Sequence, residues 1–118
     1  MYNGIMPYVD EQKQRDAQKR YYEENKNKYA QRNRERRGKL RQHMVSIKEK
    51  AVCVDCLIDY PSYVLDFDHV RGTKRYNISA QLSNFGSIEA LQKEIDKCDI
   101  VCANCHRHRT WHRLKKEL

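Results

Sequence analysis

The sequence lacks the long apolar run that a membrane span requires, because no stretch approaches the roughly 18 apolar residues of a transmembrane helix. Its first residues, MYNGIMPYVDEQKQ, have no basic segment followed by an apolar one, so no secretory signal is expected. These absences predict a cytoplasmic protein with no membrane partner. Thiols stay reduced there, so the five cysteines indicate metal binding rather than a disulfide framework.

Acidic residues are too few to balance the basic ones, and the 118 residues carry a formal net charge of +8. The length allows one small domain with at most an arm. Residues 1–50 hold 14 Lys and Arg against 7 Asp and Glu, whereas residues 51–118 hold 10 against 9. A polyanionic partner is expected, although basicity alone does not separate nucleic acid from an acidic surface. The chain is predicted to divide into a basic arm, 1–50, and a nearly neutral domain, 51–118.

Proline is absent from residues 10–42, which are rich in Gln, Glu, Lys and Arg, so a helix is predicted there, with Gly38 interrupting or ending it. Three interpretations of this arm stay open. It is a solvated tail, a helix that lies along DNA, or a helix whose tyrosine row, Tyr8, Tyr22 and Tyr29, packs on another subunit. The arginines proposed for DNA contact are Arg32, Arg34, Arg36 and Arg37.

Two C-x-x-C pairs follow the arm, Cys53 with Cys56 and Cys102 with Cys105. Paired knuckles of this kind in a reduced compartment predict a structural Zn²⁺ held by four thiolates. The alternative is a redox-active pair, but neither pair opens a helix after a strand in a βαβ setting. Cys98 could compete as a ligand, although its place before a short apolar run favours a buried thiol.

The knuckles are separated by 45 residues, far more than the roughly 15–20 of a compact zinc ribbon, so zinc is expected to close a long insertion. Residues 63–70 alternate apolar and polar as in a strand, 71–74 supply a turn, and 75–78 return as a second strand. Residues 87–96 form an amphipathic pattern that Ser87 can cap, and a further helix is predicted over 104–116.

The order of C-x-x-C, LDFDHVRG and CANCHRHRT resembles the HNH endonuclease family, in its four-cysteine zinc-bound subclass. The resemblance covers about residues 51–110 and leaves the N-terminal 50 outside. It implies a small α+β ββα-metal (His-Me finger) domain preceded by the basic helical arm. The family includes phage recombination, homing and packaging-associated nucleases, so DNA, a homodimer, and phage replication, packaging or recombination proteins are the partners to be considered.

Carried over by position, the resemblance makes Asp68 and His106 ligands of a catalytic Mg²⁺, Mn²⁺ or Ni²⁺, and His69 the general base that deprotonates the attacking water. A phosphodiester is anionic, so its hydrolysis needs charge neutralisation, an activated water and a stabilised leaving oxygen. Further DNA contacts are proposed on the loop and the last helix. These are Arg71, Lys74, Arg107 and Arg109, with His108 assigned to the surface or to DNA.

One position departs from the family pattern. The middle Asn, which orients the base strand, is expected about nine residues before the last ligand, and that neighbourhood here is Asp96-Lys97-Cys98. Asn104 is nearby but lies inside the second knuckle, so the group that orients His69 is left open. The rival to an enzyme is a non-catalytic zinc-bound DNA-binding or assembly module, and a thiol oxidoreductase is a third interpretation. The DNA that is cut, and whether it is nicked or broken, are not specified.

Overall fold

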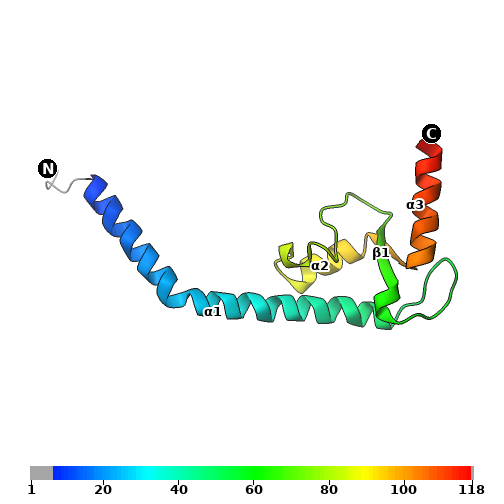
Figure 1. Cartoon of the computed structure of the whole chain (residues 1–118), viewed down its shortest axis with the longest axis horizontal. Coiled ribbons are helices and arrows are strands. Elements are labelled where there is room, and N and C mark those ends of the chain that lie inside the picture. The colour runs from blue at the N-terminus through cyan, green and yellow to red at the C-terminus, as the bar shows by residue number, and fades with distance from the viewer. Residues whose placement is uncertain (1–6, 118) are drawn as a thin grey trace. The chain divides into compact units, whose positions relative to one another are not determined.

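A computed structural model of the chain describes residues 7–117. These residues form an α+β fold of three helices and one two-stranded sheet, and Figure 1 shows their arrangement along the chain. The chain divides into two compact units between Glu35 and Arg36. No helix among the described residues is long and apolar enough to cross a bilayer. The elements in order are α1 Pro7–Glu49, a 3-10 turn at Ser62–Val64, β1 Leu65–His69, a 3-10 turn at Leu82–Asn84, α2 Ile88–Ile95, β2 Cys98–Cys102 and α3 Ala103–Glu117.

Helix α1 is a single helix of 43 residues, so the predicted interruption at Gly38 is wrong. Gly38 lies inside the helix, and a Cβ added there would have no atom within 4 Å. One helical glycine costs only about 0.5–1 kcal/mol relative to alanine, which the neighbouring strong helix formers and the packing of the following turns outweigh. Within the unit that ends at Glu35, Tyr22 and Tyr29 stack with ring centroids 6.5 Å apart, and the side chain of Tyr8 lies outside the described residues.

Replacing Gly38 by alanine is therefore expected to raise the free energy of unfolding by about 0.5–1 kcal/mol, measured by urea denaturation. Gly72 provides the opposite control, because its φ of +66° is one that a side chain disfavours. Gly72→Ala should lower the stability by about 1 kcal/mol. A loss of stability in Gly38→Ala would contradict the unobstructed helical position.

The packed unit begins at Arg36, within α1, rather than at the predicted boundary after residue 50. The packed unit starts within α1 because Leu40, which is 1% exposed, is a buried member of the first core cluster. Met44 and Ile47, also on α1, pack against the same cluster. Arg36 also donates hydrogen bonds to the carbonyls of Ser83 and Phe85. The last turns of α1 are thus part of the domain core. The buried partners of Leu40 in that cluster are Ile78, Leu82, Phe85, Leu91, Ile95 and Cys98.

The sheet consists of β1 and β2 paired antiparallel, with Leu65 opposite Cys102 and His69 opposite Cys98. The predicted strand at residues 63–70 is confirmed as β1, whereas the predicted strand at residues 75–78 is wrong. Ile78 is instead a core residue of the loop. β1 pairs instead with β2, which is the apolar run before the second knuckle. Cys53 and Cys102, one from each knuckle, lie in one core cluster with Leu65 and Val101, and this packing brings β2 beside β1.

Both predicted helices after the sheet's first strand are confirmed. Ser87 caps α2, because its side chain accepts a hydrogen bond from the backbone N–H of Ala90 at 3.1 Å. Leu91, Glu94 and Ile95 form the buried face of α2. Helix α3 starts directly after β2, so the second knuckle joins the end of the sheet to the helix that carries His106.

Candidate metal and histidine sites

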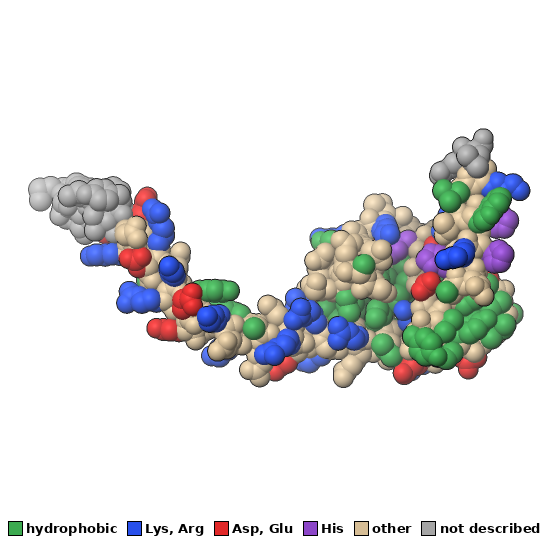
Figure 2. Space-filling view, viewed as in Figure 1, with side chains coloured by type: hydrophobic (Ala, Val, Ile, Leu, Met, Phe, Trp, Pro, Cys, Tyr) green, Lys and Arg blue, Asp and Glu red, His purple; other side chains and the backbone are tan. Residues whose placement is uncertain are grey.

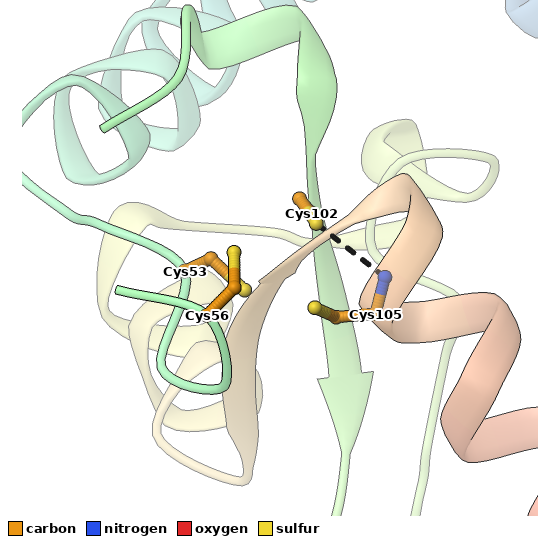
Figure 3. Close-up of side chains that lie close together, drawn as sticks. All are labelled: Cys53, Cys56, Cys102 and Cys105. Atoms are coloured by element: carbon orange, nitrogen blue, oxygen red, sulfur yellow. Dashed lines mark hydrogen bonds between the residues drawn. The ribbon is translucent and has the colours of Figure 1, made fainter. Parts of the chain in front are cut away.

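The four predicted cysteines come together, and their sulfur atoms lie within 4.8 Å of one another (Figure 3). Cys53 and Cys56 come from the loop after α1, Cys102 ends β2, and Cys105 lies in the first turn of α3. Four thiolates about 2.3 Å from one Zn²⁺ are about 3.8 Å apart, so this cluster has the size of a tetrahedral zinc site. The prediction of a four-cysteine cluster that could hold a structural zinc is confirmed.

The thiols of the cluster share hydrogen bonds, and the one with Cys102 raises the pKa of Cys105 to about 12, whereas the pKa of Cys53 falls. Burial opposes ionisation of Cys53, but hydrogen bonds from the backbone N–H groups of Cys56, Cys102 and Asp55 outweigh it and lower the pKa of Cys53 to about 6. The opposite holds for Cys98, where burial raises the pKa of the thiol to about 12. Cys98 lies outside the cluster, and its thiol donates to the carbonyl of Glu94 at 3.5 Å. It is the buried thiol that the sequence favoured.

On the α3 side of β1, His106 lies between two carboxylates. Its Nδ1 is 3.1 Å from Asp66 Oδ2, and its Nε2 is 3.7 Å from Asp68 Oδ1. Asp66 and Asp68 share this side because side chains two residues apart point to the same face of a strand. The predicted pair Asp68 and His106 is therefore brought together, with Asp66 as a partner for the second ring nitrogen. Carboxylate contact at one nitrogen fixes the tautomer and leaves the other nitrogen free to bind a cation.

Two arginines of α3 hold Asp68, which is only 4% exposed. Arg113 donates to both carboxylate oxygens at 2.8 Å, and Arg109 donates to Oδ2 at 2.9 Å. The bonds from Arg113, with those from Arg109, outweigh burial and lower the pKa of Asp68 to about 2. Arg109 also contacts Asp55 at 2.6 and 2.7 Å and Asp99 at 3.0 Å. Its donors are engaged inside the protein, so the predicted phosphate contact by Arg109 does not fit this geometry.

His69, the last residue of β1, uses Nε2 to contact Glu94 Oε2 of α2 at 2.9 Å. Glu94 is 2% exposed and also accepts from Lys97 Nζ at 2.8 Å and from the backbone N–H of Arg75 at 2.9 Å. Burial would keep Glu94 neutral, but Lys97, Arg75 and His69 lower its pKa to about 2. Among the hydrogen bonds of the described residues, none joins His69 to Asp68 or His106. His69 is adjacent to Asp68 in the strand but is anchored from α2.

The group that orients His69 is thus Glu94, which the sequence reasoning missed. Asn104 is exposed in the first turn of α3, and no hydrogen bond within residues 7–117 links it to His69. A signal for Glu94 was present, because it occupies the apolar face of α2, three residues after Leu91 and next to Ile95. A carboxylate at such a position is buried, and a buried carboxylate needs a partner.

The other predicted DNA contacts fall into two groups. Arg71 and Arg36 are used within the fold, since Arg71 bonds Asp99 at 3.0 Å and Arg36 bonds backbone carbonyls. The rest, like His108, are exposed to solvent and remain available to a polyanion. They are Arg32, Arg34, Arg37, Lys74 and Arg107.

The depressed pKa of Glu94 predicts a loss of stability in acid. Its pKa is about 2 in the folded chain against an ordinary 4.5. The stabilisation is therefore complete above pH 5 and is lost as the pH falls from 4.5 to 2, by about 3 kcal/mol. Glu94→Gln should flatten this part of the curve of unfolding free energy against pH, whereas Glu89→Gln, an exposed carboxyl on the same helix, should not. Parallel curves for wild type and Glu94→Gln would contradict the assignment.

No family model matches the chain, and no curated protein or solved structure is significantly similar to it. Function has to be inferred from the residues and the geometry described above.

Proposed function

We propose that the chain is a metal-dependent DNA endonuclease of the HNH type, with a structural zinc and one catalytic divalent cation. The observation that carries the proposal is the placement of His106 between Asp66 and Asp68. It is supported by the order of elements, in which a strand ending in Asp68-His69 pairs with a second strand that leads into the helix of His106. That order is consistent with a ββα-metal finger.

The donor atoms of Asp68 and His106 fit one small cation. Two ligands about 2.1 Å from one Mg²⁺ lie roughly 3.0 Å apart when adjacent and roughly 4.2 Å apart when opposite. The separation of 3.7 Å between Oδ1 and Nε2 is about 0.7 Å wider than the adjacent spacing, so a small side-chain rotation would bring both atoms onto one cation. Mg²⁺ keeps several waters and takes few protein ligands, so two donors suffice. Asp66 would accept the Nδ1 proton of His106 and hold the ring with Nε2 toward the cation.

His69 is proposed as the general base, with Glu94 as its positioning residue. The contact of Nε2 with a buried, ionised carboxylate places the donor proton on Nε2 and leaves Nδ1 with its lone pair. Glu94 also stabilises the imidazolium that forms when Nδ1 takes a proton from water. Lys97 and the Arg75 backbone keep Glu94 in place, so the base is pre-oriented before substrate binds.

The proposed hydrolysis proceeds by attack of a water oxygen on phosphorus with transfer of the water proton to His69. The bond from phosphorus to the 3′ oxygen breaks, and a solvent water protonates the departing 3′ oxygen. Asp68 and His106 would hold the cation, which would supply neutralisation of the negative charge on the phosphodiester. Arg113 is a half-exposed arginine whose only carboxylate partner among the described residues is Asp68. It is positioned to exchange that contact for a phosphate oxygen of DNA, whereas Arg109 is anchored by three carboxylates.

A plasmid-nicking assay tests the proposal. Zinc-loaded protein is incubated with supercoiled DNA and Mg²⁺, Mn²⁺ or Ni²⁺, and Asp68→Asn and His106→Ala are compared with wild type at increasing metal concentration. Wild type should nick, and both variants should require more metal and cleave more slowly. Glu89→Gln, an exposed carboxyl on α2 outside the site, is the matched control and should behave as wild type.

The rival function is a zinc-bound DNA-binding or assembly module without catalysis. One observation favours it, because the bidentate contact of Arg113 with Asp68 would also serve as a structural ion pair that joins α3 to the sheet. The same assay separates the two. Absence of cleavage by wild type with all three metals, in protein that binds DNA, would support the rival.

The exposed arginines of α1 are proposed to contact the DNA backbone. Replacing Arg32, Arg34 and Arg37 by glutamine should weaken binding of a DNA duplex. The slope of log Kd against the logarithm of the salt concentration should decrease by up to about three. Such a triple variant is preferable to deleting residues 1–42, because that deletion removes Leu40 from the core. An unchanged salt dependence would show that the helix has another role.

A further inference from the structure

A group of apolar side chains is exposed on the loop that carries the first knuckle. Leu57 is 72% exposed and Tyr63 is 84% exposed, and Val52, Val54 and Ile58 are each at least two-fifths exposed. Figure 2 shows green side chains gathered over the loop between α1 and β1. Single exposed apolar residues are ordinary, but a contiguous patch on one short segment marks an interaction surface. These five residues are called the knuckle patch below.

Leu57 adds a second observation. Its φ is +62°, and it is the one non-glycine residue with positive φ among residues 7–117. The knuckle imposes this conformation, since the N–H of Leu57 donates to the carbonyl of Cys53 at 2.8 Å. Glycine adopts it without strain, whereas a leucine in it is strained. The chain therefore carries a strained residue in order to hold a large apolar side chain in solvent, which indicates a function for that side chain.

The charge around the patch selects the kind of partner. Asp59 is exposed within the segment, and four thiolates around one Zn²⁺ leave a net charge of −2. The segment 51–63 contains no Lys or Arg. Such a surface repels nucleic acid and favours a protein segment that combines aromatic and basic side chains.

The chain itself contains a segment of that chemistry. Helix α1 presents Tyr21 and Tyr22, which are 59% and 58% exposed, and Tyr29, which is 37% exposed. Exposed basic residues surround them: Lys19, Arg20, Lys26 and Lys28. Within the unit that ends at Glu35, no other described element covers these rings. Most helical stability in proteins comes from tertiary packing of one face, so packing against a partner would stabilise this part of α1.

We infer that the knuckle patch binds the tyrosine-bearing part of α1 from a second copy of the chain. Tyrosine rings supply large contact area at low cost in side-chain entropy, and the flanking lysines and arginines complement Asp59 and the zinc–thiolate charge. Two copies that exchange their helices in this way form a closed dimer with two identical contacts. Arg32, Arg34 and Arg37 lie beyond the tyrosines and stay free for DNA.

The experiment measures self-association of the zinc-loaded full chain by sedimentation velocity, together with two variants. Leu57→Gly removes the patch's most strained side chain and suits the knuckle's backbone, so zinc content should be unchanged and the melting temperature unchanged or higher. Tyr22→Ser with Tyr29→Ser removes the stacked tyrosines. Each variant should dimerise at least about tenfold more weakly than wild type. Ile88→Thr, an exposed apolar residue on α2, is the control and should dimerise normally.

Mixing the two variants is the decisive step. The Leu57→Gly copy has an intact tyrosine helix, and the double tyrosine variant has an intact patch, so a mixture restores one of the two contacts. A heterodimer should form at concentrations at which each variant alone is monomeric. A monomeric wild type, a dimer that survives Leu57→Gly, or a mixture that stays monomeric would each overturn the inference. Dimerisation that is lost in Leu57→Gly but not restored by mixing would indicate a patch-to-patch contact instead.

Discussion

His69→Ala is expected to lower metal-dependent nicking of supercoiled DNA by about 10²–10⁴-fold, the range that general-base catalysis contributes. The reason is that His69 is the imidazole at the end of β1 whose Nδ1 is left free by the contact of Nε2 with Glu94. The variant should still bind one zinc and should bind duplex DNA as wild type does, because neither function uses His69. The measurement is the single-turnover rate at saturating metal and enzyme.

His43→Ala is the matched control, because His43 is also a partly buried histidine bonded to a side-chain oxygen, that of Gln92 at 2.6 Å. It lies on α1 and is bonded to Gln92 of α2 rather than to Asp68, His69 or His106, so its removal should leave the rate unchanged. Glu94→Gln should fall between wild type and His69→Ala, and it should shift the pH profile of the rate, since a neutral amide no longer stabilises the imidazolium. A wild-type nicking rate in the His69→Ala variant would contradict the proposal that His69 is the general base.

The parts of the site that local spacing determines were predictable. The four cysteines of the cluster follow from the two C-x-x-C pairs, because each knuckle positions two thiols by its own backbone and one Zn²⁺ would require both knuckles as ligands. The juxtaposition of Asp68 with His106 followed from the resemblance, and the geometry agrees because Cys102 and Cys105 join β2 to α3 beside β1. Helix α2 with its Ser87 cap was readable from periodicity.

The parts that depend on long-range packing were not predictable from the pattern. Residues 75–78 have strand-like composition, yet β1 pairs with β2, with Leu65 opposite Cys102 of the four-cysteine cluster. Ile78 in the loop is instead buried in the same core cluster as Leu40 of α1. That same packing moves the start of the domain to Arg36, although composition changes only near residue 50.

The contacts made by Glu94 and Arg113 illustrate the same limit for charges. Each lies more than 20 residues from its partner, His69 and Asp68 respectively. Sequence spacing does not report such pairs, whereas the buried face of α2 and the alignment of α3 along β1 determine them. A charged residue at an apolar helix position is the one sequence signal that would have indicated Glu94.

The zinc cluster is expected to have the largest effect on folding. Cys105→Ser should abolish binding of zinc and remove most of the domain's stability, since structural zinc contributes an apparent free energy of about 10–16 kcal/mol in small domains. The second core cluster has four buried residues, and two of them, Cys53 and Cys102, are ligands in the same site. Apart from these ligands, the buried apolar residues of that cluster are Leu65 and Val101, with the partly buried Tyr60, Val64 and Ile100 against them. This core is too small to hold β1, β2 and α3 together without the metal.

Hydrogen exchange should locate this loss. Amides of the knuckle loop, β1 and β2 should lose protection first, whereas α2 and the packed turns of α1 rest on the first core cluster and should retain more of it. Cys98→Ser is the matched control, because Cys98 is buried seven residues from Cys105 but lies outside the four-sulfur group. It should bind one zinc with unchanged stoichiometry and lose only about 1–2 kcal/mol from a buried hydroxyl. A Cys105→Ser protein that retains zinc and melts as wild type does would mean that the four thiolates are not the anchor of the fold.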